Sequence, residues 1–221
     1  MFGKRLFVAS WLIGITSFAI PVWAAVPGTV ATFDAGEDGF IGSTIATVQV
    51  HLANGGNPNG FVQIRKDLET GFDIGTQNSN WPEFLGDYAA AGINGGGFDL
   101  NVFNIAFNQV HFRFRRNVAE NGWYYDFGPV APNGNAWVPL DVAFDPTWSD
   151  LTAAANGWSQ ETGSPSFAAL MGSVGWIEAR LINEGSALAG IDNVRIVPEP
   201  GTLALLLAGT AILGRRRLAR A

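Results

Sequence analysis

The chain has 221 residues with a formal net charge of −6, and it contains 28 glycines and no cysteine. Six of its 13 basic residues lie in the two terminal segments, so the middle of the chain is strongly acidic, which disfavours nucleic-acid binding. The absence of cysteine excludes disulfides and thiolate chemistry. Glycines interleaved with aromatic and β-branched residues predict short strands and many turns.

Residues 1–24 predict a removable export signal. Lys4 and Arg5 precede an apolar run over 6–20, and Val22 and Ala24 fit the −3 and −1 positions of signal peptidase cleavage. We expect cleavage after Ala24. The alternative is a retained anchor, which the short apolar run disfavours.

Several segments of the middle region, residues 25–197, predict β-strands, because alternating or β-branched residues in each are bounded by turn residues. They are 29–34, 45–52, 61–66, 98–103, 109–115, 124–127, 137–142, 175–182 and 191–197. In 45–52, alternation predicts a solvated His51 and a core-facing set of Ala46, Val48, Val50 and Leu52.

The segment 109–115 has the pattern of an antiparallel strand with one buried face. Phe112 and Phe114 are expected in the core, while His111, Arg113 and Arg115 are expected to face water.

Helix is limited to two short segments, 147–155 and 165–171, the second with Ser164 as its N-cap. The glycine-rich segment 54–60 predicts a turn. Many strands with few helices predict an all-β fold, a two-sheet antiparallel β-sandwich.

The C-terminal segment has three parts: Pro198-Glu199-Pro200, an apolar helix over 202–214, and the arginines 215–217. The apolar stretch barely crosses a hydrocarbon core, and its arginines favour a cytoplasmic end, so transient inner-membrane insertion is expected. Segment 198–221 closely resembles the PEP-CTERM sorting signal of Gram-negative bacteria. The resemblance implies cleavage near Pro198, Glu199 and Pro200 by an exosortase and delivery to the cell surface or extracellular matrix. A plain, uncut transmembrane anchor is the alternative.

Four segments of the middle region, in order, resemble the laminin IV type A domain (laminin B). They are HLANGGNPNGFVQI, WPEFLGDYAAAGINGGGFDLNV, SPSFAALMGSVGWIEARLINEG and LAGIDNVRI. The chain departs from that pattern at Asn59, which replaces a glycine, and in the looser turn over 92–97. The resemblance implies a jelly-roll sandwich like those of galactose-binding and carbohydrate-binding modules.

Two carboxylates are candidates for a structural calcium ion between the first and last strands, Asp34 and Asp192. Calcium takes six to eight oxygens, many of which a glycine-rich turn supplies from its carbonyls. The alternative is that both carboxylates cap turns by accepting backbone N–H groups.

Two tryptophans beside polar loops, Trp81 and Trp123, are candidates for stacking against sugar rings. The alternative is that they lie in the core, where most tryptophans of a sandwich are found. Trp137 and Trp176 lie within predicted strands and are expected in the core.

Catalysis is disfavoured, because His51 and His111 lie on different predicted strands and no catalytic motif occurs. The leading interpretation is a non-catalytic surface or matrix protein associated with exopolysaccharide. The second is a calcium-stabilised carbohydrate-binding module. The third is a secreted glycoside hydrolase with an unrecognised carboxylate pair.

Overall fold

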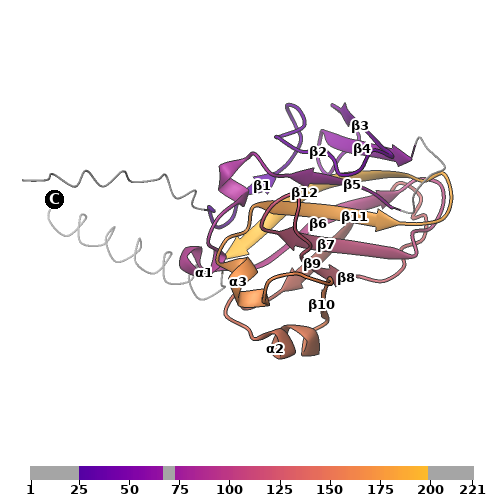
Figure 1. Cartoon of the computed structure of the whole chain (residues 1–221). Helices are drawn as coiled ribbons and strands as arrows, with labels where there is room; N and C mark the ends of the chain where they lie inside the picture. The colour runs from indigo at the N-terminus through magenta and orange to yellow at the C-terminus, as the bar shows by residue number, and fades with distance from the viewer. Residues whose placement is uncertain (1–24, 67–72, 199–221) are drawn as a thin grey trace, which may run out of the picture.

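The computed structural model describes residues 25–66 and 73–198. They form two antiparallel sheets packed face to face, with short helices gathered toward one end (Figure 1). The all-β, two-sheet antiparallel sandwich predicted from the sequence is confirmed. No helix within these residues is long and apolar enough to span a membrane. The predicted signal segment 1–24 and most of the predicted sorting tail, residues 199–221, lie outside the described residues.

The first sheet, here called sheet A, is built around the long C-terminal strand. Its order is β3 (Thr47–Leu52), β4 (Phe61–Lys66), β12 (Leu188–Pro198), β6 (Ile93–Val102) and β9 (Val138–Ala143), and β1 (Val30–Ala31) also pairs with β12. β12 therefore lies in the middle of sheet A and also pairs with β1, the first strand of the domain.

The second sheet, sheet B, has the order β10 (Trp158–Gln160), β8 (Trp123–Asp126), β7 (Gln109–Arg115), β11 (Trp176–Ile182), β5 (Asp73–Asn78) and β2 (Ile41–Gly42). The strands β2, β5 and β10 were not predicted from the sequence. β10 is only three residues long, and β5 has a glycine and a run of polar residues.

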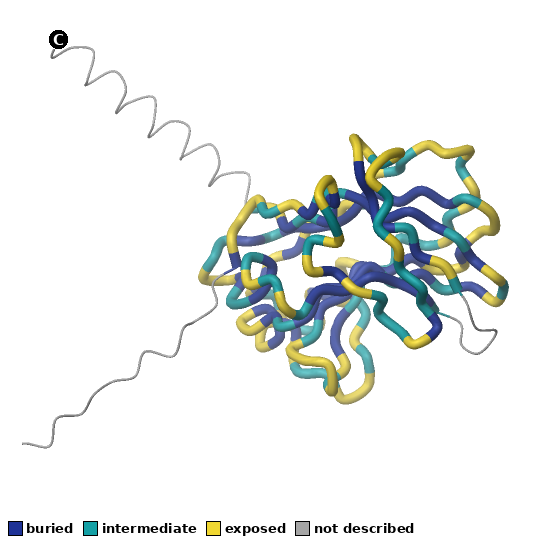
Figure 2. Tube along the Cα trace, turned by 90° about the horizontal axis from the view of Figure 1, so that it is seen from above, coloured by how far each residue is buried: buried dark blue, intermediate teal, exposed yellow. Residues whose placement is uncertain are grey.

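The core between the sheets is aromatic. Phe98 of sheet A and Phe112 and Phe114 of sheet B are fully buried, and Phe112 and Phe114 pack edge to face with ring centroids 4.9 Å apart. Edge-to-face packing suits the aromatic quadrupole and adds to the free energy of burial. Figure 2 shows the buried residues along the strands and the exposed ones mostly at the turns.

The helices are η1 (Pro82–Phe84), α1 (Tyr88–Ala91), α2 (Asp150–Ala155) and α3 (Phe167–Met171). The two predicted helices exist but begin later than expected. Ser149 caps α2 by accepting from the Thr152 N–H, and Ser166, rather than Ser164, caps α3 by accepting from the Ala169 N–H. In each case the serine is the last extended residue before the helix.

The first predicted strand, 29–34, is shorter than expected, because Phe33 has a positive φ of 52° that ends the extended conformation. The predicted turn at 92–97 is wrong beyond Gly92. Gly95, Gly96 and Gly97 belong to β6 and pair with both β12 and β9.

The face assignment for β3 is wrong. Its polar residues point inward: the Gln49 side chain donates to the Phe40 carbonyl (2.9 Å), and His51 Nε2 lies 2.7 Å from the Phe33 carbonyl oxygen. Val50 is 44% exposed and points outward with Val48 and Leu52. The inner face of β3 contacts backbone carbonyl groups of the segment 33–40. Buried carbonyl groups need hydrogen-bond partners, so this face carries polar side chains rather than apolar ones.

Candidate functional site

The outer face of sheet B carries a layer of polar side chains that is almost closed to solvent. Because Phe112, Phe114 and Ile177 point into the core, their strand neighbours point outward. Those neighbours are nevertheless buried: His111 and Glu178 are 2% exposed and Arg113 is 4% exposed. The sequence correctly placed His111, Arg113 and Arg115 away from the core, but the expectation that this face is wet is wrong.

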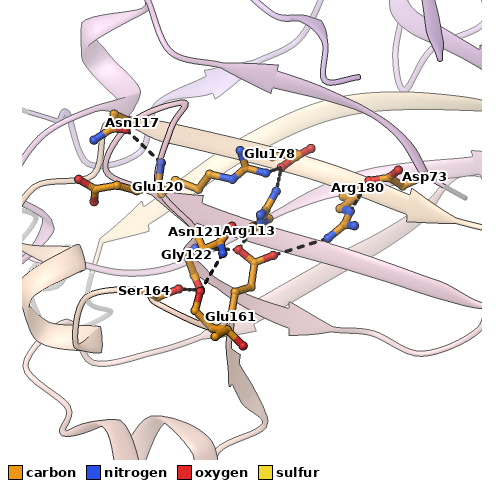
Figure 3. Close-up of polar contacts among 12 residues, drawn as sticks. Asp73, Arg113, Asn117, Glu120, Asn121, Gly122, Glu161, Ser164, Glu178 and Arg180 are labelled. Atoms are coloured by element: carbon orange, nitrogen blue, oxygen red, sulfur yellow. Dashed lines mark hydrogen bonds and ion pairs between the residues drawn. The ribbon is translucent and has the colours of Figure 1, made fainter. Parts of the chain in front are cut away.

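Alternating charges connect this layer (Figure 3). Arg113 donates from Nη1 to Glu178 (2.9 Å) and from Nη2 to Glu161 (2.5 Å), so one guanidinium joins β11 to the segment after β10. Glu161 also accepts from the Gly122 backbone N–H (2.7 Å) and lies 3.6 Å from Arg180 Nη1. Arg180 in turn donates from Nε to Asp73 (2.7 Å). The network spans most of the width of sheet B and fixes each side chain in one orientation.

The buried end of this network is costly to assemble. Burial raises the pKa of Glu178, although the guanidinium groups of Arg113 and Arg180 act in the opposite direction. An ion pair taken out of water gains little net free energy, but removing one partner leaves the other charge uncompensated. The network therefore holds these side chains in fixed positions more than it adds to the free energy of unfolding.

Aromatic rings share the same face. Tyr124 stacks on His111 with ring centroids 4.2 Å apart, and the Arg115 guanidinium lies 5.2 Å from the centre of the Trp176 ring. The Trp176 Nε1 atom, the Gln77 Oε1 atom and both ring nitrogens of His111 are buried without hydrogen-bond partners. Burial lowers the pKa of His111 to about 4, although the Asp126 carboxylate opposes the shift.

A rim of partly exposed groups surrounds the closed layer. The side chain of Arg180 is 23% exposed, that of Asp73 is 29% exposed and that of Asp126 is 31% exposed, and Tyr124 is half-buried. The rim thus offers an aromatic ring, a fixed guanidinium and fixed carboxylates side by side. Such a set matches a sugar, whose C–H face packs on a ring while its hydroxyls pair with charged groups.

The two tryptophans predicted to bind sugar lie elsewhere. Trp123 is 1% exposed, donates from Nε1 to the Pro165 carbonyl (2.9 Å) and packs edge to face on Phe167, so its prediction as an exposed platform is wrong. Trp81 is half-buried against the core ring of Phe84 and leaves only part of its ring accessible.

The two tryptophans expected in the core lie on the outer faces of the sheets. Trp176 is buried as expected, with 7% exposure, but on the outer face of sheet B beside Glu178 and Arg180, as its position in β11 requires. Trp137 is half-buried on sheet A and donates from Nε1 to the Gly55 carbonyl (3.0 Å). The sequence could have predicted the position of Trp176, because it lies two and four positions before Glu178 and Arg180, and such residues of a strand share one face.

The candidate calcium ligands meet at the loop 54–60. Asp192 is fully buried and accepts from the N–H groups of Asn57 (2.5 Å) and Asn193 (2.7 Å), while Asp34 accepts from the Gly60 N–H (3.4 Å). Burial raises the pKa of Asp192 to about 6, the two backbone N–H groups lower it, and the charges of Asp99 and Asp34 raise it further.

Both carboxylates therefore hold backbone groups, as the alternative interpretation requires. Within 25–66 and 73–198, no group of three or more His, Cys, Asp or Glu side chains is arranged to hold a metal ion. A calcium ion here would need carbonyl oxygens of the loop to complete its shell. The calcium site stays a prediction.

The comparisons with known proteins show which fold this chain has, but they do not assign it to a family. No protein-family model matches the chain, and no curated protein matches it. Among solved structures, the chain is similar to the family 11 carbohydrate-binding module of Clostridium thermocellum, solved in complex with a β-1,3-1,4-mixed-linked tetrasaccharide. The identity is 13% over 79% of this chain and 98% of that one, and the TM-score is 0.51.

It is also similar to part of an exo-β-agarase, with 12% identity, a TM-score of 0.53, and coverage of 78% of this chain and 26% of that one. At such low identity these likenesses show the fold, a β-sandwich of the type found in carbohydrate-binding modules, and nothing about activity.

Proposed function

We propose that this chain is an exported, non-catalytic glycan-binding protein that contacts polysaccharide with the outer face of sheet B. The observation that carries the proposal is the pre-organised rim on that face. Tyr124 stacks on buried His111, Asp126 accepts from the Val110 and Gly128 N–H groups, and Arg180 is held by Asp73 and Glu161. Binding to a rigid site avoids the entropy cost of ordering side chains.

The chemistry of the rim favours a neutral or weakly charged polymer. Arg180 is matched by Asp73 and Glu161, so the face offers both donors and acceptors without a net positive field. The acidic character of the whole chain also disfavours strongly anionic polymers. The likeness to a carbohydrate-binding module that was solved with a bound oligosaccharide supports this class of ligand.

Binding without hydrolysis is favoured by the state of the acidic residues on this face. Hydrolysis of a glycoside requires two accessible carboxyl groups on either side of the bond. Glu178 is 2% exposed and bound to Arg113, and Glu161 is held by Arg113 and a backbone N–H. The more exposed Asp73 accepts from Arg180, and Asp126 accepts from the Val110 and Gly128 N–H groups, so all four carboxylates already have partners.

Mutation of the rim tests the binding proposal. Tyr124→Ala and Asp126→Asn are expected to reduce retention on native exopolysaccharide, mixed-linkage β-glucan or agarose in affinity electrophoresis, with little change in melting temperature. Leu151→Ala, at a residue that is 82% exposed on α2, is the matched control and is expected to bind as the wild type does. If both rim variants were retained as strongly as the wild type, the outer face of sheet B would not be the glycan-binding surface.

Export and sorting form the other half of the proposal, supported by the order of signal segment, folded domain, Pro198-Glu199-Pro200, apolar stretch and arginines. Intact mass and cell fractionation of the protein from its native host test it. A mature chain starting at Ala25 and ending near Pro198 to Gly201 at the surface is the expected result. A chain that retains residues 215–221 in the inner membrane would show that the tail is a plain anchor.

A further inference from the structure

The outer face of sheet A holds a cavity of about 530 Å³ at the end of β12, on the side of the sandwich opposite the sheet B rim. Its volume lies in the range of small-molecule sites. Its shape follows from the sheet register, in which β6 lies between β12 and β9.

Two rows of paired residues cross the sheet at this point. One row is Val197, Gly95 and Ala143, and the next is Arg195, Gly97 and Asp141. Directly paired residues in antiparallel strands point to the same face. Each row therefore has a bare glycine in the middle and side chains on both sides, which makes a trough along β6 about 10 Å wide between β12 and β9.

The glycines of this trough are not equivalent. A Cβ atom on Gly96 would lie 2.6 Å from the Phe112 ring, and one on Gly97 would lie 2.0 Å from the Leu140 carbonyl oxygen, so packing forbids side chains at both. A Cβ atom on Gly95 would lie 3.3 Å from the Val142 carbonyl oxygen and 3.6 Å from Val197 Cβ, which is tight but much less restrictive than the contacts at Gly96 and Gly97. Glycine weakens a strand interior and often marks a place where a ligand or another backbone approaches closely.

A fixed polar group closes one end of the trough. Arg195 donates from Nε to Asp141 (2.7 Å) and from Nη1 to Asp99 (2.8 Å), so its guanidinium is held rigidly above Gly97. Neither Arg195 Nη2 nor Asp141 Oδ2 takes part in these bonds, and the Asp141 side chain is 56% exposed. A donor and an acceptor thus stand side by side at the cavity.

The remaining wall is apolar. Val197 is 39% exposed, and Ala143 and Pro198 also line the cavity. A ligand that fits must be flat enough to reach the floor at Gly95, apolar on its faces and rich in hydroxyl groups at one edge. It must also carry no negative charge, because the two carboxylates of Asp99 and Asp141 already outnumber the single guanidinium of Arg195.

We propose that this trough is a second ligand site, which takes one neutral pyranose ring of a polysaccharide, and that the protein is therefore bivalent. The second half of this statement rests on the proposed function of sheet B. Sites on opposite faces of a rigid sandwich face away from each other, so they join two polymer chains rather than grip one. The domain then acts as a cross-link within the extracellular polymer.

Filling the trough tests the second site directly. Gly95→Val places a side chain on the floor, so it is expected to weaken binding in the trough roughly tenfold or more, with the melting temperature measured to show that the fold is retained. Asp141→Asn removes the acceptor without adding bulk and is expected to weaken the same site. Gln63→Val, which adds the same kind of side chain to the same face on β4, is the matched control and should bind as the wild type does.

The probes are the β-1,3-1,4-linked glucose tetrasaccharide and neutral oligosaccharides from partial hydrolysis of the native host's extracellular polymer. Amide chemical shifts and calorimetric stoichiometry of the full-length chain are measured with each. The expected result is that Gly95→Val loses one of two sites and Tyr124→Ala loses the other. Unchanged stoichiometry and unchanged shifts at Gly95 in the wild type overturn the second site, whereas the behaviour of Tyr124→Ala judges the sheet B site separately.

Cross-linking is measured by light scattering of the purified chain mixed with the intact polymer. The wild type is expected to form large particles, and Gly95→Val and Tyr124→Ala are each expected to bind polymer without forming them. Particle growth that persists in Gly95→Val contradicts bivalency through the trough.

Discussion

Buried His111 should make the stability of this protein depend on pH in a direction that the structure determines. Burial lowers its pKa from 6.5 to about 4 in the folded chain. As the pH falls, the unfolded chain takes up this proton first, so the stabilisation is complete above about pH 6.5 and is lost as the pH falls toward about 4. The whole difference corresponds to about 3 kcal/mol.

His111→Phe isolates this contribution. The phenyl ring keeps the stacking on Tyr124, and no hydrogen bond is lost, because both ring nitrogens of His111 lack partners. From about pH 7.5 to about pH 5, linkage predicts that the wild type loses about 2 kcal/mol more of its free energy of unfolding than the variant does.

Urea unfolding followed by tryptophan fluorescence at the two pH values measures this difference, provided that the dependence on urea concentration is the same for both proteins. The reasoning fails if wild type and variant lose the same free energy between the two values. That result would mean that His111 takes up its proton in the folded state as easily as in water.

Three further predictions follow from named contacts. Arg113→Met is expected to destabilise the fold by about 3–5 kcal/mol, because buried Glu178 loses its closest cation and the nearest that remains is Arg115 Nη2 at 3.8 Å; the double variant with Glu178→Met should recover most of that loss in the same urea assay. Gly190→Ala would place a Cβ atom 2.8 Å from the Trp137 ring; it should lower stability by about 1–3 kcal/mol and shift tryptophan fluorescence, and an unchanged spectrum would contradict the packing. Burial, and then the charges of Asp99 and Asp34, raise the pKa of Asp192. A calcium ion would relieve the repulsion among these carboxylates, so we expect a chelator to lower the melting temperature and Asp192→Asn to abolish that response; equal melting curves with and without chelator would exclude the calcium site.

The fold class could be predicted because each strand carries local information about its period. In β7, the alternation of phenylalanine with histidine and arginine assigns the inner and outer faces correctly. In β3, alternation separates two sets correctly but does not say which one is buried, since a one-residue change of register exchanges the faces. The deciding contacts of Gln49 and His51 are to the carbonyls of Phe40 and Phe33, nine and 18 positions earlier.

The closed polar layer of sheet B could not be predicted from β7 alone. The acids that neutralise Arg113 are 48 and 65 positions away, at Glu161 and Glu178. Local sequence shows that a side chain leaves the core, but whether it then reaches water depends on which strands flank it. Ion pairing between long side chains of adjacent strands covers the face and buries groups that a strand considered alone would leave solvated.

Trp123 and Tyr124 show how the pairing of β8 with β7 decides which aromatic side chain is exposed. Trp123 is paired with Phe114 of β7, a core residue, and so points inward, whereas Tyr124 is paired with Arg113 and points outward. Trp123 is the residue predicted from the sequence to stack against sugar, whereas the residue of this strand that reaches the rim is its neighbour Tyr124. In an antiparallel sheet every aromatic residue belongs to one face or the other by its register. A glycan that binds the proposed face is therefore expected to contact Tyr124 and to leave Trp123 untouched.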